Sequence, residues 1–306
     1  MADVTILGVF VADTAFRAAR MPKMGETILG DTFLLGPGGK GSNQAVAAAR
    51  MGAKTAIITK LGKDNFADMA LKTWADCGVI AHVEQLEDSY TGAAFIFLEA
   101  STGDNAIIIS PGAAATLCPA DIDKNAELIT GAKVFMTQLE QPLDAAFHAL
   151  SLAKSAGVTT MLNPAPAADL PAEMLALCDY ISPNETEAEA LTGLPVSTVE
   201  EAKAAAEALC KLGVGTPIIT LGERGAYLHG HGLVPALNAG PVVETTGAGD
   251  AFNGGFAAAL AAGKTPLEAV RIGCATAAIS VTRKGAAPSM PSLAEVEALM
   301  ARLADK

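Results

Sequence analysis

Apolar and polar positions follow two different spacings along the chain. Runs rich in apolar and β-branched residues predict strands buried on both faces, at residues 5–11, 55–61, 133–137, 159–162 and 217–221. Between them, apolar residues that recur every three or four positions predict helices at residues 42–51, 66–77, 143–156, 199–212 and 248–262. This alternation of strands and helices predicts an α/β fold whose mostly parallel sheet is covered by helices on both faces.

Two segments, residues 16–35 and 93–109, interrupt this alternation. They contain short extended pieces at residues 26–29, 93–98 and 106–109, with turn residues at 102–105 and no room for a helix. We interpret them as a small separate sheet, inserted into the main domain as a lid over a site. The alternative is that they add edge strands to the main sheet. No repeat or linker divides the chain, so we predict one domain over residues 1–306, with lid segments at about 14–35 and 92–110.

Composition and charge narrow the functional classes. Of 306 residues, 51% are hydrophobic and 18% charged, which is typical of a well-packed globular protein. A net charge of −12 argues against nucleic acid or an anionic membrane as a partner. The first apolar run, residues 6–12, has no basic leader and is too short to span a bilayer. Five scattered cysteines without a CxxC pair favour a reducing, cytoplasmic location.

The strongest chemical signal is Glu-Thr-Thr-Gly-Ala-Gly-Asp-Ala-Phe-Asn-Gly at residues 244–254. Here a glycine-rich turn opens directly into an alanine-rich helix, so that free N–H groups and the positive helix end converge on one point. Such a point is suited to a phosphoryl group in transfer. Asp250 would lie in the first turn, where its carboxylate could take a proton from an attacking hydroxyl. The alternative is that Asp250 only caps the helix.

A second glycine-rich segment, Gly-Pro-Gly-Gly-Lys-Gly-Ser-Asn-Gln at residues 36–44, resembles a phosphate-binding loop only superficially. A Walker A loop requires Ser or Thr directly after its lysine, but Gly41 follows Lys40. The segment also fails the dinucleotide pattern GxGxxG with a trailing acid. What remains is an exposed backbone that offers Lys40 and Asn43 to a polyhydroxy ligand, or a flexible turn with a solvated lysine.

Two further segments could face the same cleft. Asn184 and Glu187 lie three residues apart at the start of a helix, which suits hydrated Mg²⁺ on ATP phosphates and equally suits a capping box. Residues 220–225, Thr-Leu-Gly-Glu-Arg-Gly, end a buried strand in a glycine-punctuated turn. That turn could hold nucleotide phosphates or simply begin a hairpin into residues 226–228.

Taken in chain order, these motifs resemble one family. GGKGSNQAVAAARMGA from Gly38, NPAPA at residues 163–167, PNETEAE at 183–189, TTGAGDAFNGG from Thr245 and VTRKGAAPSMP from Val281 are similar to ribokinase and its phosphofructokinase-B-type (PfkB) carbohydrate kinase relatives. The resemblance runs nearly end to end. It implies a three-layer α/β sandwich with a β-sheet lid, dimerisation through the lid, and transfer of phosphate from Mg-ATP to a pentose.

The resemblance also implies roles for particular residues. Catalysis falls on Gly247, Ala248, Gly249 and Asp250, with Asp250 as the base. Sugar contacts fall on Val11, Asp13, Gly39, Lys40, Gly41, Ser42, Asn43, Glu140 and Asp250. Nucleotide contacts fall on Asn184, Glu187, Thr220, Leu221, Gly222, Glu223, Arg224, Gly225, Gly249 and Cys274. A K⁺ site, built largely from backbone carbonyls, falls on Glu244, Thr246, Ser280, Arg283, Gly285 and Ser289.

Two departures from the family pattern bear on substrate and ion. Ribokinases usually carry Asn-Ala-Asp where this chain has Val11-Ala12-Asp13, and the usual Asp of the cation loop is Glu244 here. The resemblance therefore implies an ATP-dependent kinase that phosphorylates the 5-hydroxyl of D-ribose, with a kinase of 2-deoxyribose or another pentose as the nearest alternative. Nucleoside and hexose kinases are more distant.

Two other classes of protein fit the sequence less well. Retention of Asp250 and Glu187 argues against a catalytically silent sensor. The absence of the dinucleotide pattern GxGxxG argues against a dehydrogenase.

Overall fold

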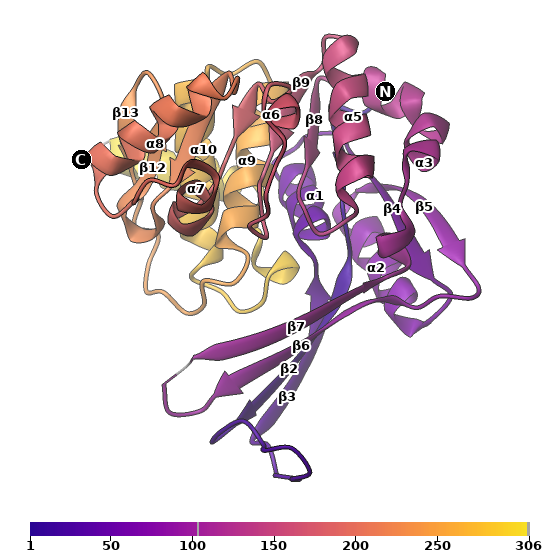
Figure 1. The fold of residues 1–306 in the computed structure, drawn as a ribbon. Coiled ribbons are helices and arrows are strands. Elements are labelled where there is room, and N and C mark those ends of the chain that lie inside the picture. Colours follow the sequence, from indigo (N-terminus) through magenta and orange to yellow (C-terminus); the bar gives the residue numbers. More distant parts are fainter. Residues whose placement is uncertain (103, 305–306) are drawn as a thin grey trace.

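The computed structural model describes residues 1–102 and 104–304, and a nine-stranded sheet forms the centre of this part of the chain. The strand order is β13-β12-β11-β10-β9-β8-β1-β4-β5, parallel except for β12 and β13 (Figure 1). The strands are β1 (Val4–Leu7), β4 (Thr55–Gly62), β5 (Ile80–Leu86), β8 (Val134–Thr137), β9 (Thr159–Leu162), β10 (Tyr180–Ile181), β11 (Thr216–Thr220), β12 (Gly225–Leu228) and β13 (Gly232–Pro235).

Helices cover both faces of this sheet, so the three-layer α/β prediction is confirmed. One face carries α1 (Lys40–Arg50), α2 (Asn65–Cys77), α9 (Ala248–Ala261), α10 (Pro266–Ser280) and α11 (Leu293–Ala304). The other carries α3 (Pro119–Lys124), α4 (Ala126–Thr130), α5 (Leu143–Ser155), α6 (Ala172–Leu175), α7 (Glu185–Thr192) and α8 (Val199–Lys211). No helix in the described part of the chain combines the length and apolarity that crossing a membrane requires.

Small residues allow α9 to pack tightly between α1 and α10. A β-carbon at Gly254 would lie 2.4 Å from Cβ of Ala47 on α1, and one at Gly255 would lie 2.4 Å from Oγ1 of Thr276 on α10. Real side chains do not tolerate such distances, so both glycines are required by helix packing. This packing fixes the start of α9, and with it Asp250, against the start of α1.

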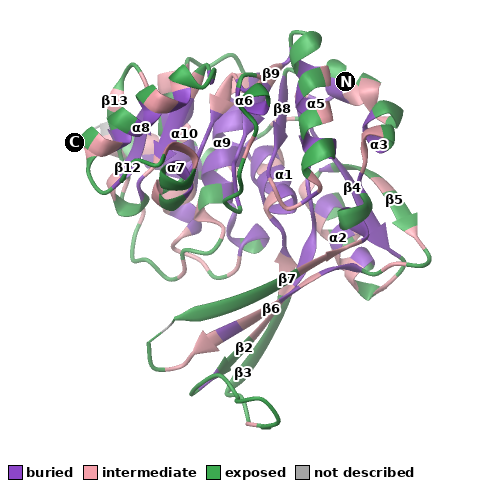
Figure 2. Ribbon diagram, viewed as in Figure 1, coloured by how far each residue is buried: buried purple, intermediate pink, exposed green. Residues whose placement is uncertain are grey.

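A second, four-stranded sheet projects from the main body (Figure 1). Its order is β3-β2-β6-β7, with β2 and β6 parallel and the outer pairs antiparallel. The strands are β2 (Val11–Ala18), β3 (Thr32–Gly38), β6 (Thr91–Glu99) and β7 (Asn105–Gly112). A small separate sheet is therefore confirmed, and the alternative of extra edge strands is wrong. Figure 2 shows how much of this sheet is exposed.

Several boundaries differ from the predictions. The run at 5–11 is divided between β1 and β2, because the backbone of Gly8 packs against Gly41, whose Cα would lie 2.6 Å from a β-carbon there. Residues 26–29 form no strand, and their place in the small sheet is taken by β3. Strands β5 and β10 were not predicted. Gly103, in the predicted turn at 102–105, lies outside the described residues.

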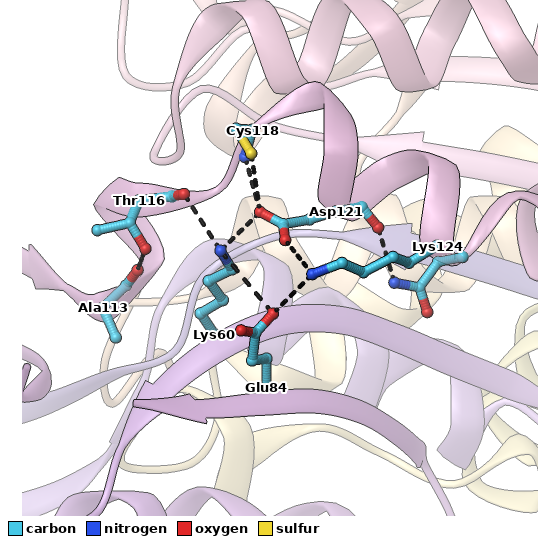
Figure 3. Close-up of polar contacts among 8 residues, drawn as sticks. Lys60, Glu84, Ala113, Thr116, Cys118, Asp121 and Lys124 are labelled. Atoms are coloured by element: carbon cyan, nitrogen blue, oxygen red, sulfur yellow. Dashed lines mark hydrogen bonds and ion pairs between the residues drawn. The ribbon is translucent and has the colours of Figure 1, made fainter. Parts of the chain in front are cut away.

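A buried ion pair between the large sheet and α3 also contacts the segment that follows the small sheet (Figure 3). Lys60 on β4 lies 2.6 Å from a carboxylate oxygen of Asp121 on α3, and both side chains are buried. The same ammonium donates to the carbonyl of Thr116, in the 3₁₀ turn η1 (Ala113–Thr116) that follows β7. On the β6 side, Gly62 N–H donates to Oγ1 of Thr91. The hydrogen bonds from Lys60 and Gly62 therefore join β4 to the turn after β7 and to the start of β6.

Candidate active site

Polar side chains gather where the parallel strands of the large sheet end. Gln138 follows β8, Asn163 follows β9 and Asn184 follows β10, while α1 and α9 begin beside them. Hydrogen bonds from Gln44 on α1 to both Asn163 and Asp250 show that these elements meet. The carboxyl edge of an open α/β sheet is where such folds bind ligands.

Asp250 lies in the first turn of α9, but its carboxylate does not cap that helix. Oδ2 accepts from Nδ2 of Asn43 at 2.9 Å, and Oδ1 accepts from Nε2 of Gln44 at 2.9 Å. Burial raises the pKa of Asp250, while the positive charge of Lys40 and these two hydrogen bonds act in the opposite direction. The carboxylate is thus turned toward α1 as an acceptor, which is the arrangement that a general base requires.

The start of α9 presents free backbone donors to the cleft. Gly247 adopts φ +78°, a conformation that favours glycine, and Ala248 N–H turns back to the carbonyl of Thr245. Within the described residues, the N–H groups of Gly249 and Asp250 have no acceptor. A β-carbon at Gly249 would meet open space. Two unpaired donors at the positive end of a helix fit a phosphoryl group.

The glycine-rich segment is built by close packing and not by a flexible turn. A β-carbon at Gly39, where φ is +86°, would lie 2.5 Å from the carbonyl oxygen of Val9, and one at Gly38 would lie 2.2 Å from Oδ2 of Asp13. Residues 36–38 end β3, and α1 begins at Lys40. Gly41 packs on Gly8, and the hydroxyl of Ser42 faces away from the cleft, accepting from the indole of Trp74.

Three carboxylates and one ammonium lie near one another in front of α9. Backbone N–H of Lys40 donates to Oε2 of Glu140 at 2.8 Å. Burial, then the charges of Asp250 and Glu244, raise the pKa of Asp13 to about 6. Burial likewise raises the pKa of Glu140 to about 7, against the attraction of Lys40. For Lys40, burial alone would lower the pKa, but the neighbouring carboxylates, Asp250 first among them, raise it.

Further features on this side of the cleft suit a hydroxyl-rich ligand. Oδ1 of Asn43 is buried and has no partner among the described residues. Such an atom carries a cost that a ligand donor would remove. Val11 lies two residues before Asp13, so both side chains point to the same face of β2, and Val11 is 2% exposed. The acceptors Asp13 and Asn43 therefore share this part of the cleft with one apolar side chain, Val11.

The two segments predicted to hold nucleotide lie side by side. Thr220 N–H donates to the carbonyl of Pro183 at 2.9 Å, and Asn184 forms an isolated parallel bridge with Thr220. Asn184 and Glu187 form a reciprocal capping box, and burial raises the pKa of Glu187. Leu221 is buried, whereas Gly222 and Glu223 are exposed, and Gly225 begins β12.

Two of the residues predicted to contact nucleotide are committed to other contacts. The guanidinium of Arg224 lies 3.0 Å from Oε1 of Glu185 and donates to the carbonyl of Ser197. Its charge is thus partly neutralised by the scaffold. Cys274, on α10, is 6% exposed and belongs to the apolar core, which raises the pKa of its thiol to about 12. Neither side chain is free to act as a phosphate ligand in this arrangement.

The loops predicted to hold K⁺ contact each other. Gly285 N–H donates to Oε2 of Glu244 at 2.9 Å, and Val243 N–H donates to the carbonyl of Val281. The hydroxyls of Ser280 and Ser289 donate to carbonyls of their own segments, and the guanidinium of Arg283 pairs with Glu295 on α11. Thr246 is exposed between Glu244 and Gly247. Glu244 and backbone hydrogen bonds therefore join the two loops. The side chains of Ser280, Ser289 and Arg283 take no part in this contact.

Sequence reasoning assigned no role to three buried amides behind Asp250. Gln44, Gln138 and Asn163 are 0%, 0% and 7% exposed, and Gln44 hydrogen-bonds to each of the other two. The sequence did carry a signal for Gln44. This glutamine directly precedes the run Ala-Val-Ala-Ala, which is typical of a buried helix. A buried amide is costly unless it is fully paired, so such a position points to a specific partner.

The model of the pfkB family carbohydrate kinases matches residues 1–293 of this chain. The chain belongs to this family. As a pfkB kinase it is a phosphotransferase that uses ATP to phosphorylate a sugar hydroxyl. Phosphoryl transfer accounts for the gathering of the unpaired donors of α9, the Asp250 carboxylate and the acidic cluster at the carboxyl edge of the large sheet.

Relatives and solved structures agree with this assignment. A ribokinase of Haemophilus influenzae is 40% identical over 295 residues, covering 95% of this chain and 96% of the relative. A deoxyribokinase of Salmonella typhi is 39% identical over 300 residues, covering 95% and 96%. The structure of an Arabidopsis thaliana ribokinase with ribose and ATP superposes with a TM-score of 0.93 at 34% identity, covering 98% of each chain.

Proposed function

We propose that this pfkB kinase transfers the γ-phosphoryl group of ATP to the 5-hydroxyl of D-ribose. The observation that carries the proposal is the position of Asp250. Its carboxylate lies between the free N–H groups at the start of α9 and the hydroxyl-binding set of Asp13, Lys40 and Asn43. The similarity to ribokinases at 40% and 34% identity supports ribose as the acceptor.

The second candidate substrate is 2-deoxyribose. The deoxyribokinase of Salmonella typhi is as similar to this chain as the ribokinases are. Val11 supports the same candidate, because it offers a hydrocarbon surface where an amide could bind a ring hydroxyl. Both sugars have the same primary hydroxyl, so the transfer step is the same for either.

In this proposal each residue has a defined task. Asp250 takes the proton of the 5-hydroxyl as the oxygen attacks, and the N–H groups of Gly249 and Asp250 bind the phosphoryl oxygens. Asp13, Lys40, Asn43 and Glu140 hold the other sugar hydroxyls. ATP would lie across residues 183–187 and 220–225, where Gly222 and Glu223 are exposed.

Asn184 and Glu187 would hold Mg²⁺ on the ATP phosphates, with Oε1 of Glu187 as the nearest donor, because Oε2 of Glu187 and Oδ1 of Asn184 accept the N–H groups of their capping box. In the described part of the chain, no three histidine, cysteine or acidic side chains converge to form a metal cage. This donor set fits Mg²⁺ on ATP, which keeps several waters and takes few protein ligands. When bound, Mg²⁺ neutralises charge on the phosphates; the protein's part is to orient them.

The test is ADP release from ATP with a panel of pentoses, hexoses and nucleosides. We expect turnover with ribose and 2-deoxyribose at rates well above those with hexoses or nucleosides. Turnover confined to hexoses or nucleosides would contradict the proposal and leave the family assignment intact.

We propose that K⁺ activates the enzyme through the loops at 243–246 and 281–289. Glu244 joins these loops by accepting from Gly285 N–H, and Ala286 lies against Gly247 at the start of α9. At fixed ionic strength, we expect activity to rise several-fold when K⁺ replaces a bulky organic cation. Equal rates in the two salts would contradict the proposal and show that Glu244, which is one methylene longer than the usual Asp, has abolished the K⁺ site.

We propose that the enzyme is a homodimer through its small sheet, because both faces of that sheet expose apolar side chains. The exposed residues are Phe16, Phe33, Leu34, Leu35, Ile107, Ile108 and Ile109. Exposed apolar side chains gathered on one small sheet in this way mark an interaction site. Adjacent residues of a strand point to opposite faces, so Ile107→Glu and Ile108→Glu test one face each. We expect sedimentation to show a wild-type dimer that at least one variant converts to monomer; a wild-type monomer would refute the proposal.

We also propose a cytoplasmic location. The five cysteines are free thiols in the structure, and a reducing compartment keeps thiols in that state. Cell fractionation with an activity assay would test it, and recovery of the activity outside the cytoplasmic fraction would contradict it.

A further inference from the structure

Gln44 lies directly behind the proposed base. It is 0% exposed, in the first half of α1, and its side chain is hydrogen-bonded on every side. Nε2 donates to Oδ1 of Asp250 at 2.9 Å and to Oδ1 of Asn163 at 3.0 Å, while Oε1 accepts from Nε2 of Gln138 at 2.5 Å. No hydrogen of its amide is left over.

The surrounding network determines which way this amide points. Nδ2 of Asn163 donates to the carbonyl of Ser182 at 3.1 Å, so Oδ1 of Asn163 must face Gln44 as an acceptor. Asp250 also offers only acceptors when it is charged. Two acceptors on one side and the donor of Gln138 on the other admit a single orientation of the Gln44 amide. A hydrocarbon, a carboxylate or a hydroxyl could not make the same three bonds.

The two oxygens of Asp250 therefore have unequal surroundings. Oδ2 accepts from Asn43, whose other amide atom, Oδ1, has no partner in the described structure and is free for a sugar hydroxyl. Oδ1 accepts from Gln44, which has no exposed atom. An unpaired acceptor thus lies next to Oδ2, whereas the amide next to Oδ1 has both hydrogens and its oxygen paired.

We infer that Gln44 is a positioning residue, which holds the plane of the Asp250 carboxylate and stabilises its charged form through the fixed bond to Oδ1. The inference rests on the proposed function of Asp250 as base. A donor to a carboxylate favours the ionised state, which is the state that can accept a proton. The other charges facing Asp250 are Lys40 on α1, Asp13 on β2, Glu140 after β8 and Glu187 on α7.

A purely structural role would predict a different result. The backbones of α1 and α9 approach closely at Gly254, where a β-carbon would lie 2.7 Å from the carbonyl oxygen of Gln44. That contact does not involve the side-chain amide. Loss of the amide alone should therefore leave the helix packing in place while it changes the carboxylate.

The test compares Gln44→Met with Gln141→Met. Methionine keeps the length of glutamine and removes the amide. Gln141 is also buried and donates twice, to Thr137 and Gln138, but has no bond to Asp250, so it controls for loss of a buried amide. Melting temperature and circular dichroism monitor the fold of both variants, and ADP release is measured across pH.

For Gln44→Met we expect kcat to fall about 10- to 100-fold, the scale of one hydrogen bond to a charged group, with the sugar KM within about twofold. The pKa of Asp250 should rise when a donor is lost, so the acidic limb of the kcat profile should move to higher pH. Gln141→Met should leave that limb where it is. An unshifted limb in Gln44→Met, with a kcat like that of Gln141→Met, would overturn the inference. Failure of the proposed function looks different: wild type would phosphorylate no pentose, or Asp250→Asn would stay active.

Discussion

Asp250→Asn is expected to lower kcat by about 10²- to 10⁴-fold, the usual loss when a general base is removed. Asparagine keeps the shape of the side chain but cannot accept the hydroxyl proton. Its amide also fits the site poorly, because Asn43 and Gln44 both present donors and asparagine has a single acceptor oxygen. Nucleotide binding should persist, since backbone N–H groups and the segments at 183–187 and 220–225 are unchanged. Titration of ATP by calorimetry, beside turnover with ribose, checks both statements.

A matched control separates catalysis from the effect of an acid at a helix start. Asp250 is the third residue of α9, and Glu268 is the third residue of α10. Glu268 belongs to an ordinary capping box with Thr265 and is exposed. Glu268→Gln should therefore cost some stability and leave kcat near that of wild type. If Asp250→Asn retained near-normal turnover, or lost no more than Glu268→Gln, the base assignment would be wrong.

The sequence was sufficient for the layers of the fold, since β4, β8, β9 and β11 are rich in apolar and β-branched residues and the predicted helices between them have clear periodicity. It was insufficient where the signal is short or depends on distant contacts. Strand β10 has two residues, and β5 is an edge strand with mostly exposed side chains. The pairing of β2 with β6 joins residues about 80 positions apart, and no local pattern encodes it.

The candidate site shows the same limits. The motifs predicted that Asp250, Lys40 and Asn43 belong to one site. The structure adds why the glycines are required: backbones approach closely at Gly8, Gly39 and Gly41. Side-chain orientation could not be read from a motif. Arg224 and Arg283, both cationic and both in family segments, are directed to Glu185 and Glu295. The buried amides behind Asp250 depend on contacts between residues up to 206 positions apart.

Val11→Asn is expected to shift the ratio of kcat/KM for ribose over 2-deoxyribose toward ribose by about 10- to 100-fold, the scale of one buried hydrogen bond. Val11 begins β2, on the same face as Asp13, and is 2% exposed. It belongs to an apolar cluster that includes Val9 and Ala94, and a β-carbon at Gly92 would lie 3.0 Å from its Cγ1. Valine therefore places no polar atom at this position for a ring hydroxyl to bind.

The direction of the shift follows from pairing. A site that hydrogen-bonds a hydroxyl strongly rejects the analogue that lacks it, because its own polar group is then left unpaired. Wild type has no such group at position 11, so we expect it to discriminate poorly between the two sugars. Asparagine would introduce a buried amide that the 2-hydroxyl of ribose can satisfy and 2-deoxyribose cannot. Asp13, Lys40 and Asn43 remain to hold the other hydroxyls, so wild type should still accept ribose.

Val11→Ala is the matched control, because it opens space at the same position without adding a polar group. It should alter both kcat/KM values while leaving their ratio nearly unchanged, whereas Val11→Asn should move the ratio. Both sugars are compared at saturating ATP for wild type and the two variants, with melting temperatures to detect a cost of the buried amide. If wild type already prefers ribose by several orders of magnitude, or if alanine and asparagine shift the ratio equally, position 11 does not select the sugar. A shift specific to asparagine would mean that one side chain, at the junction of the two sheets, decides whether the 2-hydroxyl is recognised.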